Sequence, residues 1–362
     1  MQKDENLEEI GFTKEVEKRA GSYLLDNNRL IMNALNRAVK GKLKLLDTRD
    51  ALRKYSWLRK YYWSILSKNK DSYTKQVAKD FNGGYFIRVL PESDITLPLQ
   101  TCLMMTKPGY VQKVHNIVIV EEGAKLNILS GCVTHPMSGS AIHLGMSEFF
   151  IKKKAYLNFT MIHRWNLTTE VYPRTVALLE DKAQFVSNYL CLNPVKKLQM
   201  YPSAICKGKG SAVEFNNLIY AADTSRIDIG SEVILEGKLS KGKILSRAIV
   251  ADRGKIIARG RLVGKNTCKA HLECRGLVLS EKSKLYAIPE LMAKHNDSEL
   301  SHEAAVGKIS EKEIVYLMSR GLSRDEAIST IVRGFMDTSI LGLPRSLQKQ
   351  VRWLTERVTE GL

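Results

Sequence analysis

The middle of the chain, residues 84–300, has short apolar runs rich in Val, Ile, Phe and Tyr, separated by Gly, Lys or Asp. This alternation of strand-forming and turn-forming residues predicts β-strands. The turn-like residues recur near positions 123, 154, 182 and 209, a spacing of about 27–31 residues, which is typical of a solenoid or a propeller. We expect a mainly β fold, with a right-handed parallel β-helix core over 84–307. A two-sheet sandwich is the alternative, but the stretch lacks its Asn-Gly or Asp-Gly hairpin signals.

The two ends of the chain have a different pattern. In residues 1–83 apolar positions such as Leu24, Leu30 and Leu35 recur near helical spacing, which predicts an N-terminal α-helical domain. Within it, residues 53–63 interleave basic and aromatic side chains. This pattern suits either stacking on nucleic acid or an amphipathic helix that packs its rings on the main body.

A C-terminal α-helical domain is expected over 308–362. Ser310 and Ser323 each begin a capping box, and Gly321 separates the two helices. The pattern leaves open whether these helices cap the solenoid or dock a partner.

Charge and composition narrow the class of protein. The chain has 362 residues, a formal net charge of +18 and a pI near 9.5. The basic residues are spread along it without a nucleic-acid motif, so an acidic protein partner explains the charge as well as nucleic acid does. We see no apolar run near the roughly 18–20 residues that span a bilayer and no secretory signal, so we expect no membrane association and a cytoplasmic location.

Motifs of common enzymes are absent from the sequence. There is no P-loop, no dinucleotide-binding glycine motif, no nucleophile elbow and no zinc-protease motif. Many β-helix enzymes act on polysaccharides, but the strands here carry few of the paired carboxylates that such chemistry needs. A polysaccharide-active enzyme therefore stays only a third hypothesis.

The cysteines supply the candidate chemistry. None of the six forms a C-x-x-C pair, so we expect free thiols, mostly buried. Cys274 is followed by His302 and Glu303, and a thiolate, an imidazole and a carboxylate form a ligand set that iron–sulfur chemistry can use. His271, Arg275 and His302 are candidates to keep the Cys274 thiol deprotonated.

Several motifs occur together in one order that resembles the SufB/SufD family of iron–sulfur cluster assembly proteins, in a short, archaeal-like version. They are Leu129-Ser-Gly-Cys132-Val-Thr, Gln199-Met-Tyr-Pro-Ser203, Ala258-Arg-Gly260, Glu273-Cys274, His302-Glu-Ala304, Gly307-Lys-Ile309 and Asp325-Glu-Ala-Ile-Ser-Thr-Ile-Val-Arg-Gly-Phe335.

The resemblance implies a scaffold that is not an enzyme, which assembles a transient iron–sulfur cluster and passes it on. Cys274, Glu303 and His302 would hold the cluster, and four further cysteines are possible additional cluster or sulfur ligands: Cys132, Cys191, Cys206 and Cys268. A mixed ligand set should hold the cluster less firmly than four thiolates, as release requires.

The resemblance also implies two partners. A SufC-like ABC-type ATPase would supply ATP hydrolysis and dock on the C-terminal helices, and a second subunit, identical or of SufB/SufD type, would pair through the β-helix. The residues expected to contact the ATPase are Tyr316, Arg320, Ile328, Ile331 and Phe335. The alternative hypothesis is a basic β-solenoid that binds nucleic acid.

Overall fold

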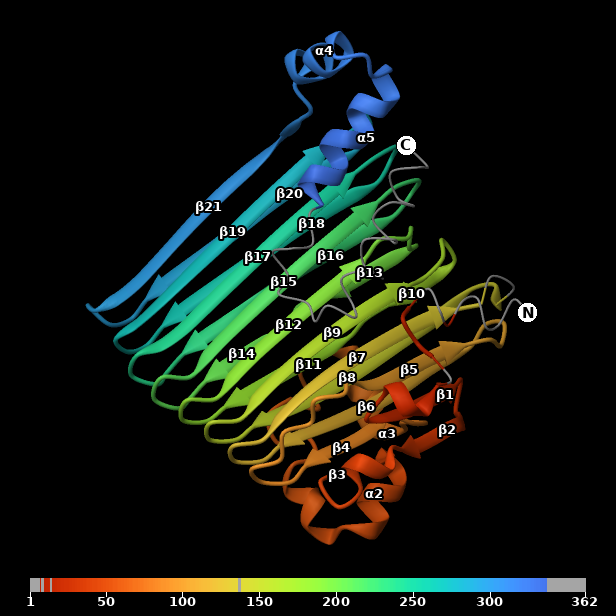
Figure 1. Ribbon diagram of the computed structural model, residues 1–362, viewed down its shortest axis with the longest axis vertical. Coiled ribbons are helices and arrows are strands. Elements are labelled where there is room, and N and C mark those ends of the chain that lie inside the picture. The colour runs from red at the N-terminus through yellow and green to blue at the C-terminus, as the bar shows by residue number, and fades with distance from the viewer. Residues whose placement is uncertain (1–6, 8–9, 14, 136–137, 337–362) are drawn as a thin grey trace.

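A computed structural model describes residues 7, 10–13, 15–135 and 138–336 of the chain. Two long sheets of mostly parallel strands face each other and form a stack of coils (Figure 1). In the described part of the chain, sheet A has ten strands in the spatial order β2 (Arg29–Leu35), β1 (Gly21–Asp26), β5 (Leu99–Met105), β7 (Lys125–Thr134), β9 (Tyr156–Arg164), β12 (Gln184–Cys191), β15 (Ala212–Ala221), β17 (Ser240–Val250), β19 (Cys268–Val278) and β21 (Ser298–Lys308).

Sheet B lies opposite sheet A. Within the same described residues it has eleven strands: β3 (Leu43–Asp47), β4 (Tyr85–Val89), β6 (Val111–Val120), β8 (Ala141–Ile151), β10 (Thr169–Val171), β11 (Arg174–Leu179), β13 (Lys197–Met200), β14 (Ser203–Cys206), β16 (Arg226–Leu235), β18 (Lys255–Gly264) and β20 (Lys284–Ala293). Successive strands of the chain alternate between the sheets over most of the core, so each pair of strands forms one coil. The predicted parallel solenoid is confirmed, and the sandwich alternative is wrong.

The coil period explains the regular turn signals of the sequence. Register partners on neighbouring coils of the core are 27 to 31 residues apart, as Val176 and Ser203 or Val111 and Ile142 show. At one corner of most coils a residue adopts a positive φ, among them Lys154 and Lys182 at 57° and 56°. Its N–H donates to the carbonyl of the next coil, so the corner residues stack into a ridge along the molecule.

The core between the sheets is apolar. Alternate residues of each strand point inward, because successive side chains of a strand lie on opposite faces. Phe149 on sheet B meets Phe185 on sheet A edge-to-face, contacts Phe159 at a tilted angle, and all three belong to one continuous cluster. Each coil thus covers the apolar surface of the previous one, and the last coil has no successor among the described residues.

The prediction of an α-helical N-terminal domain is wrong for residues 21–47, where the chain forms β1, β2 and β3. β1 lies parallel to β5 and joins sheet A, so pairing with a distant strand overrides the local helical spacing. Two α-helices follow β3, α2 (Thr48–Lys54) and α3 (Ser72–Lys79), and short 3-10 turns occur at Val16–Lys18, Arg37–Val39 and Ser56–Lys60.

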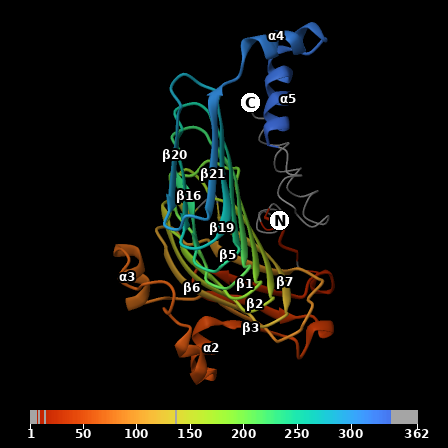
Figure 2. The ribbon, with the colours of Figure 1, turned by 90° about the vertical axis from the view of Figure 1, so that its left-hand side faces the viewer.

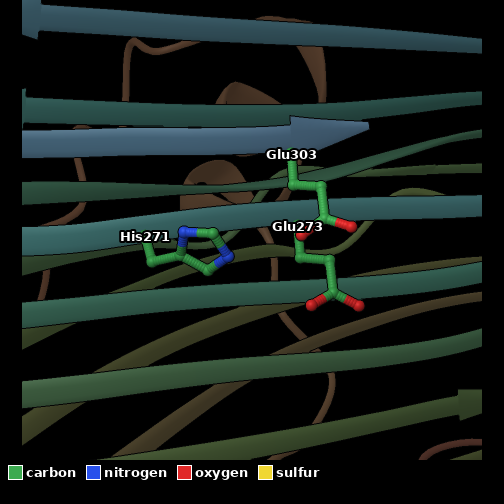
Figure 3. A group of neighbouring side chains, drawn as sticks. All are labelled: His271, Glu273 and Glu303. Atoms are coloured by element: carbon green, nitrogen blue, oxygen red, sulfur yellow. The ribbon is translucent and has the colours of Figure 1, made fainter. Parts of the chain in front are cut away.

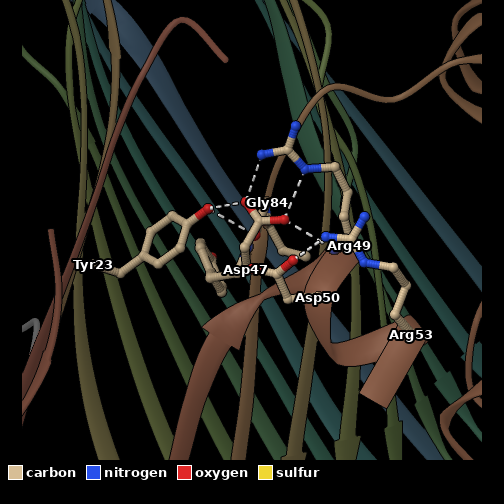
Figure 4. A network of polar contacts seen from close by, with 8 residues as sticks. Tyr23, Asp47, Arg49, Asp50, Arg53 and Gly84 are labelled. Atoms are coloured by element: carbon tan, nitrogen blue, oxygen red, sulfur yellow. Dashed lines mark hydrogen bonds and ion pairs between the residues drawn. The ribbon is translucent and has the colours of Figure 1, made fainter. Parts of the chain in front are cut away.

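A buried carboxylate attaches the N-terminal region to the first coils (Figure 4). Asp47 caps α2 and accepts hydrogen bonds from Tyr23 and Arg49 at 2.8–3.0 Å. The Tyr23 hydroxyl also donates to the carbonyl oxygen of Gly84 at 2.8 Å, so it links β1 to the residue that precedes β4. Burial, and then the Asp47 charge, raise the pKa of Tyr23 well above its usual value.

The basic and aromatic stretch packs its rings on the solenoid, as the docking alternative predicted. Trp57 contacts Phe86, and Tyr61 meets Phe150 edge-to-face with ring centroids 4.7 Å apart. Arg88 lies over the Trp57 ring at 4.5 Å. These rings are therefore occupied by contacts within the chain.

At the other end, α4 (Glu311–Ser319) lies beyond the last coil and α5 (Arg324–Phe335) turns back along the body, as Figures 1 and 2 both show. The two capping boxes expected from the sequence differ in outcome. Ser323 and Glu326 form the reciprocal bonds, whereas Ser310 begins α4 without a side-chain hydrogen bond. Residues 337–362 of the expected C-terminal domain lie outside the described residues.

Candidate functional site

The residues expected to hold a cluster lie on the last two strands of sheet A. β19 and β21 are parallel, with Leu272 opposite His302, Glu273 opposite Glu303, and Cys274 opposite Ala304. Cys274 and His302 are two positions apart on neighbouring strands and share the inward face. Strand spacings of about 4.8 Å and 3.3 Å per residue place their Cα atoms about 8 Å apart.

Glu303 lies on the outward face of the same sheet, beside Glu273. The backbone of β19 and β21 therefore separates its carboxylate from the Cys274 thiol. Within a single chain, therefore, Cys274 and His302 share one face of the sheet and Glu303 lies on the other.

The surroundings of Cys274 favour the neutral thiol. Its side chain is 2% exposed, and burial, followed by the charge of Glu273, raises the pKa of the thiol to about 11. The expectation that His271 and Arg275 keep it deprotonated is wrong, whereas His302, the third candidate, shares the inward face with Cys274. His271 and Arg275 flank it in sequence, but they point to the opposite face of the sheet, where both contact other outward groups.

The outward face of these two strands holds a second group of polar side chains (Figure 3). His271, Glu273 and Glu303 each offer a ligand atom, and the three atoms lie within 4.8 Å of one another. Arg275 pairs with Glu273 at 2.8 Å and with Glu303 at 3.4 Å. The sequence suggested Glu303 as a ligand, but it gave no role to Glu273.

The other candidate cysteines are free, as expected, and buried in the solenoid. Cys132 and Cys191 lie on either side of His163 in one row across β7, β9 and β12. Burial raises the pKa of both thiols, and that of Cys206, to about 12. Cys268 is also buried, six residues before Cys274 on the same strand.

His163 and His143 are buried polar residues that the sequence did not indicate. Nδ1 of His163 lies 2.8 Å from the Tyr189 hydroxyl, and its Nε2 has no hydrogen-bond partner in the described part of the chain. Burial lowers the pKa of His143 to about 4. The coil period would have revealed the row, because one coil after Cys132 falls on His163 and the next falls on Cys191.

The residues expected to bind a partner divide into two groups. Tyr316 is 59% exposed on α4, beside the equally exposed Val315, and Arg320 follows at the end of this helix. Ile328 and Phe335 on α5 instead pack on the outward apolar surface of sheet A. Ile331 on α5 is partly buried.

The last coil leaves apolar side chains uncovered. β20 and β21 end their sheets in the described structure, and both strands are largely exposed. Leu291 and Val306 lie on the inward faces of β20 and β21, the faces that form the core in earlier coils, yet they are 39% and 43% exposed. A long unpaired edge with apolar side chains is typical of a surface that pairs with another chain.

The protein is thus a parallel β-solenoid with a buried cysteine one strand from its open end. The family model of the SufBD core domain of the SUF system for iron–sulfur cluster assembly matches residues 103–335. The chain belongs to the SufBD family of iron–sulfur cluster assembly proteins.

Curated relatives agree over nearly the whole chain. An iron–sulfur cluster assembly SufBD family protein of Archaeoglobus fulgidus is 46% identical over 99% of this chain and 95% of its own length. A relative of the same description from Methanothermobacter thermautotrophicus is 41% identical, over 99% of this chain and 88% of its own length. A Staphylococcus saprophyticus relative is 29% identical over 87% of this chain and 68% of its own length. The expected family, including its archaeal character, is confirmed.

Across the described ranges, the helices are too short or too polar to cross a bilayer.

Proposed function

We propose that this chain is a non-enzymatic scaffold on which iron and sulfide are assembled into a transient cluster, with Cys274 as the principal ligand. The observation that carries the proposal is the place of Cys274 on the inward face of β19, one strand from the open end of a SufBD-family solenoid. A thiolate is the ligand that iron–sulfur clusters use most. A cytoplasmic location stays a prediction.

His302 is the second proposed ligand because it lies on the same face as Cys274 and on the exposed edge strand. Glu303 points to the other face, so it joins Cys274 only if ligands come from two subunits. We therefore propose that the cluster forms where the last coils of two subunits meet. This arrangement would also cover Leu291 and Val306.

Reconstitution with iron and sulfide under anaerobic conditions tests the ligand assignment. The wild-type chain should develop a broad absorbance near roughly 400 nm, as thiolate-held clusters do. Cys274→Ser should abolish or weaken it. Cys102→Ser is the matched control, because Cys102 is equally buried but lies on the first coils and packs outward. Equal absorbance from Cys274→Ser and wild type would contradict the assignment.

Pairing through the last coil has its own test. Leu291→Lys and Val306→Lys each place a charge on the uncovered apolar surface without filling any buried site. Both should convert a dimer to a monomer in light scattering after size exclusion. A wild-type chain that is monomeric at micromolar concentration would contradict self-pairing.

We further propose that a SufC-like ABC-type ATPase docks on α4, through Tyr316, Val315 and the neighbouring Met318, which is 41% exposed. An exposed apolar helix face is a common docking surface. Val315→Asp should reduce capture of the ATPase, whereas Ile31→Asp should not. Ile31 is a similarly exposed apolar residue on β2, at the opposite end of the solenoid.

The roles of the α5 residues follow from their burial. Ile328 and Phe335 attach α5 to sheet A, and Arg247 donates to the Phe335 carbonyl at 2.9 Å. Substitution of these residues would affect ATPase capture indirectly, through the position of α5 relative to α4. The four further cysteines would act as sulfur carriers or ligands only after a rearrangement that exposes them.

A further inference from the structure

The outward face of sheet A holds three potential metal ligands that are distinct from the inward Cys274. His271 and Glu273 alternate with Leu272 on β19, and Glu303 is the register partner of Glu273 on β21. Figure 3 shows the imidazole pointing towards the two carboxylates from the same side of the strands. Among the described residues, this is the one group of three or more such side chains whose ligand atoms converge.

The spacing of these atoms is close to that of a bound ion. Ligands at about 2.1 Å from one ion are about 3.0–3.4 Å apart when they are neighbours and about 4.2 Å apart when they lie on opposite sides of it. The three ligand atoms here lie within 4.8 Å of one another, so small side-chain rotations would suffice. One imidazole and two carboxylates suit divalent first-row ions such as Fe²⁺ and Mn²⁺, and three protein ligands leave coordination positions open.

The second feature that supports a metal site is the orientation of His271. Its Nδ1 lies 2.9 Å from the Ser301 hydroxyl on β21, which fixes the ring and directs Nε2 to the carboxylates. Metal-binding histidines commonly have their other ring nitrogen held by such a hydrogen bond. Ser301 is not itself one of the three ligands.

Arg275 lies beside the same carboxylates and contacts one oxygen of each, which leaves the other oxygen available for an ion. It contacts Oε1 of Glu273 and Oε1 of Glu303. A carboxylate has two oxygens and accepts several contacts, so Oε2 of each glutamate can bind an ion while Arg275 stays in place. The arginine lessens the repulsion between the two carboxylates when no ion is bound, and it also opposes a cation by its charge.

We propose that His271, Glu273 and Glu303 form a mononuclear binding site for a divalent first-row metal ion on the outward face of β19 and β21. The assignment of Fe²⁺ as the ion in the cell rests on the proposed cluster assembly function, where the site would hold iron before it enters a cluster. The metal site itself stands on the geometry of the three side chains.

Titration of the full-length chain with Mn²⁺, followed by the loss of the free-ion electron paramagnetic resonance signal, tests the site. Wild type should bind one Mn²⁺ per chain, and anaerobic Fe²⁺ should displace it. His271→Ala and Glu273→Gln should each weaken binding by at least about tenfold, as the loss of even an outer-shell partner commonly does. Circular dichroism of each variant checks that it is folded.

Two control variants separate the site from general surface charge. Glu299→Gln removes a carboxylate from the same strand, one that pairs with Lys269 at 3.0 Å, and should leave Mn²⁺ binding unchanged. Arg275→Gln should strengthen binding, because a competing cation is removed. Absence of Mn²⁺ binding by wild type, or equal weakening by Glu299→Gln and Glu273→Gln, would overturn the proposal.

Cys274→Ser distinguishes this site from the cluster site. It should retain Mn²⁺ binding while it loses cluster reconstitution, since its side chain lies on the other face. Loss of Mn²⁺ binding in Cys274→Ser would refute the outward site, whereas full reconstitution by this variant would refute the proposed cluster ligand and leave the Mn²⁺ result intact.

Discussion

The Cys274 thiol should resist ionisation until the solution is strongly alkaline. Burial, with a smaller contribution from Glu273, raises the pKa of this thiol from 9.0 to about 11. At pH 8 the thiolate fraction is then about 0.1% instead of about 10%, and alkylation, which requires the thiolate, should be about 100-fold slower from ionisation alone. Iron binding must displace this proton, so cluster loading should release a proton and increase with pH.

The assay is iodoacetamide labelling of the full-length chain between pH 7 and pH 10, with mass spectrometry of the peptide that contains Cys274. The logarithm of the rate should rise by about one per pH unit throughout this range, because the pKa lies above it. The slope separates ionisation from simple steric protection, which would change the rate equally at each pH.

Two comparisons complete this experiment. The chain unfolded in urea should show a rate that levels off near pH 9, as an ordinary thiol does. Glu273→Gln should move the folded profile to lower pH, by less than the effect of burial. A rate for folded wild type that levels off below about pH 9.5 would refute the reasoning and would point to a cation near the thiol.

Three further predictions concern stability. Glu148→Ala should lower the free energy of unfolding by about 3 kcal/mol, because the fully buried Glu148 carboxylate accepts hydrogen bonds from three backbone N–H groups of residues 63–66. Proteolysis within 56–71 should also increase, and an unchanged urea midpoint would contradict this prediction. Gly237→Ala should cost about 1–3 kcal/mol, since a Cβ there would lie 2.0 Å from the Gly208 carbonyl oxygen, while Gly307→Ala has no atom within 4 Å and serves as the control in thermal melts. Burial raises the pKa of the Cys132 and Cys191 thiols to about 12, so their stabilising contribution is complete below pH 9 and is lost as the pH rises towards 12. Each thiol should lower the free energy of unfolding by about 1 kcal/mol between pH 9 and pH 10 in denaturant titrations, and a flat profile would refute this prediction.

The fold of the core followed from periodicity along the chain. The corner residues near 123, 154 and 182 predicted the coil length because each coil needs a turn at the same place, and a positive φ at Lys154 and Lys182 confirms them. The N-terminal strands did not follow from the sequence. The run Gly21–Asp26 is fully buried and has no alternation to reveal a strand, and its pairing with β2 on one side and β5 on the other determines its conformation.

The candidate site was identified in part. Motifs selected Cys274, His302 and Glu303 as residues, but motif order does not state on which side of a sheet a side chain lies. Register decides this: Glu303 is opposite Glu273, and alternation then places it on the face away from Cys274. The same register brings His271 beside the two glutamates, a group that joins two separate motifs.

The sequence by itself determined the repeat, the family and the cysteine with its neighbours, because these depend on residue order along one chain. The tertiary structure alone decided the ionisation of the Cys274 thiol, the face on which each ligand lies and the strands at the N-terminal end. These properties depend on burial and on partners one coil away or further, and neither is a function of local sequence. A pKa, in particular, follows from the desolvation that all the surrounding coils impose together.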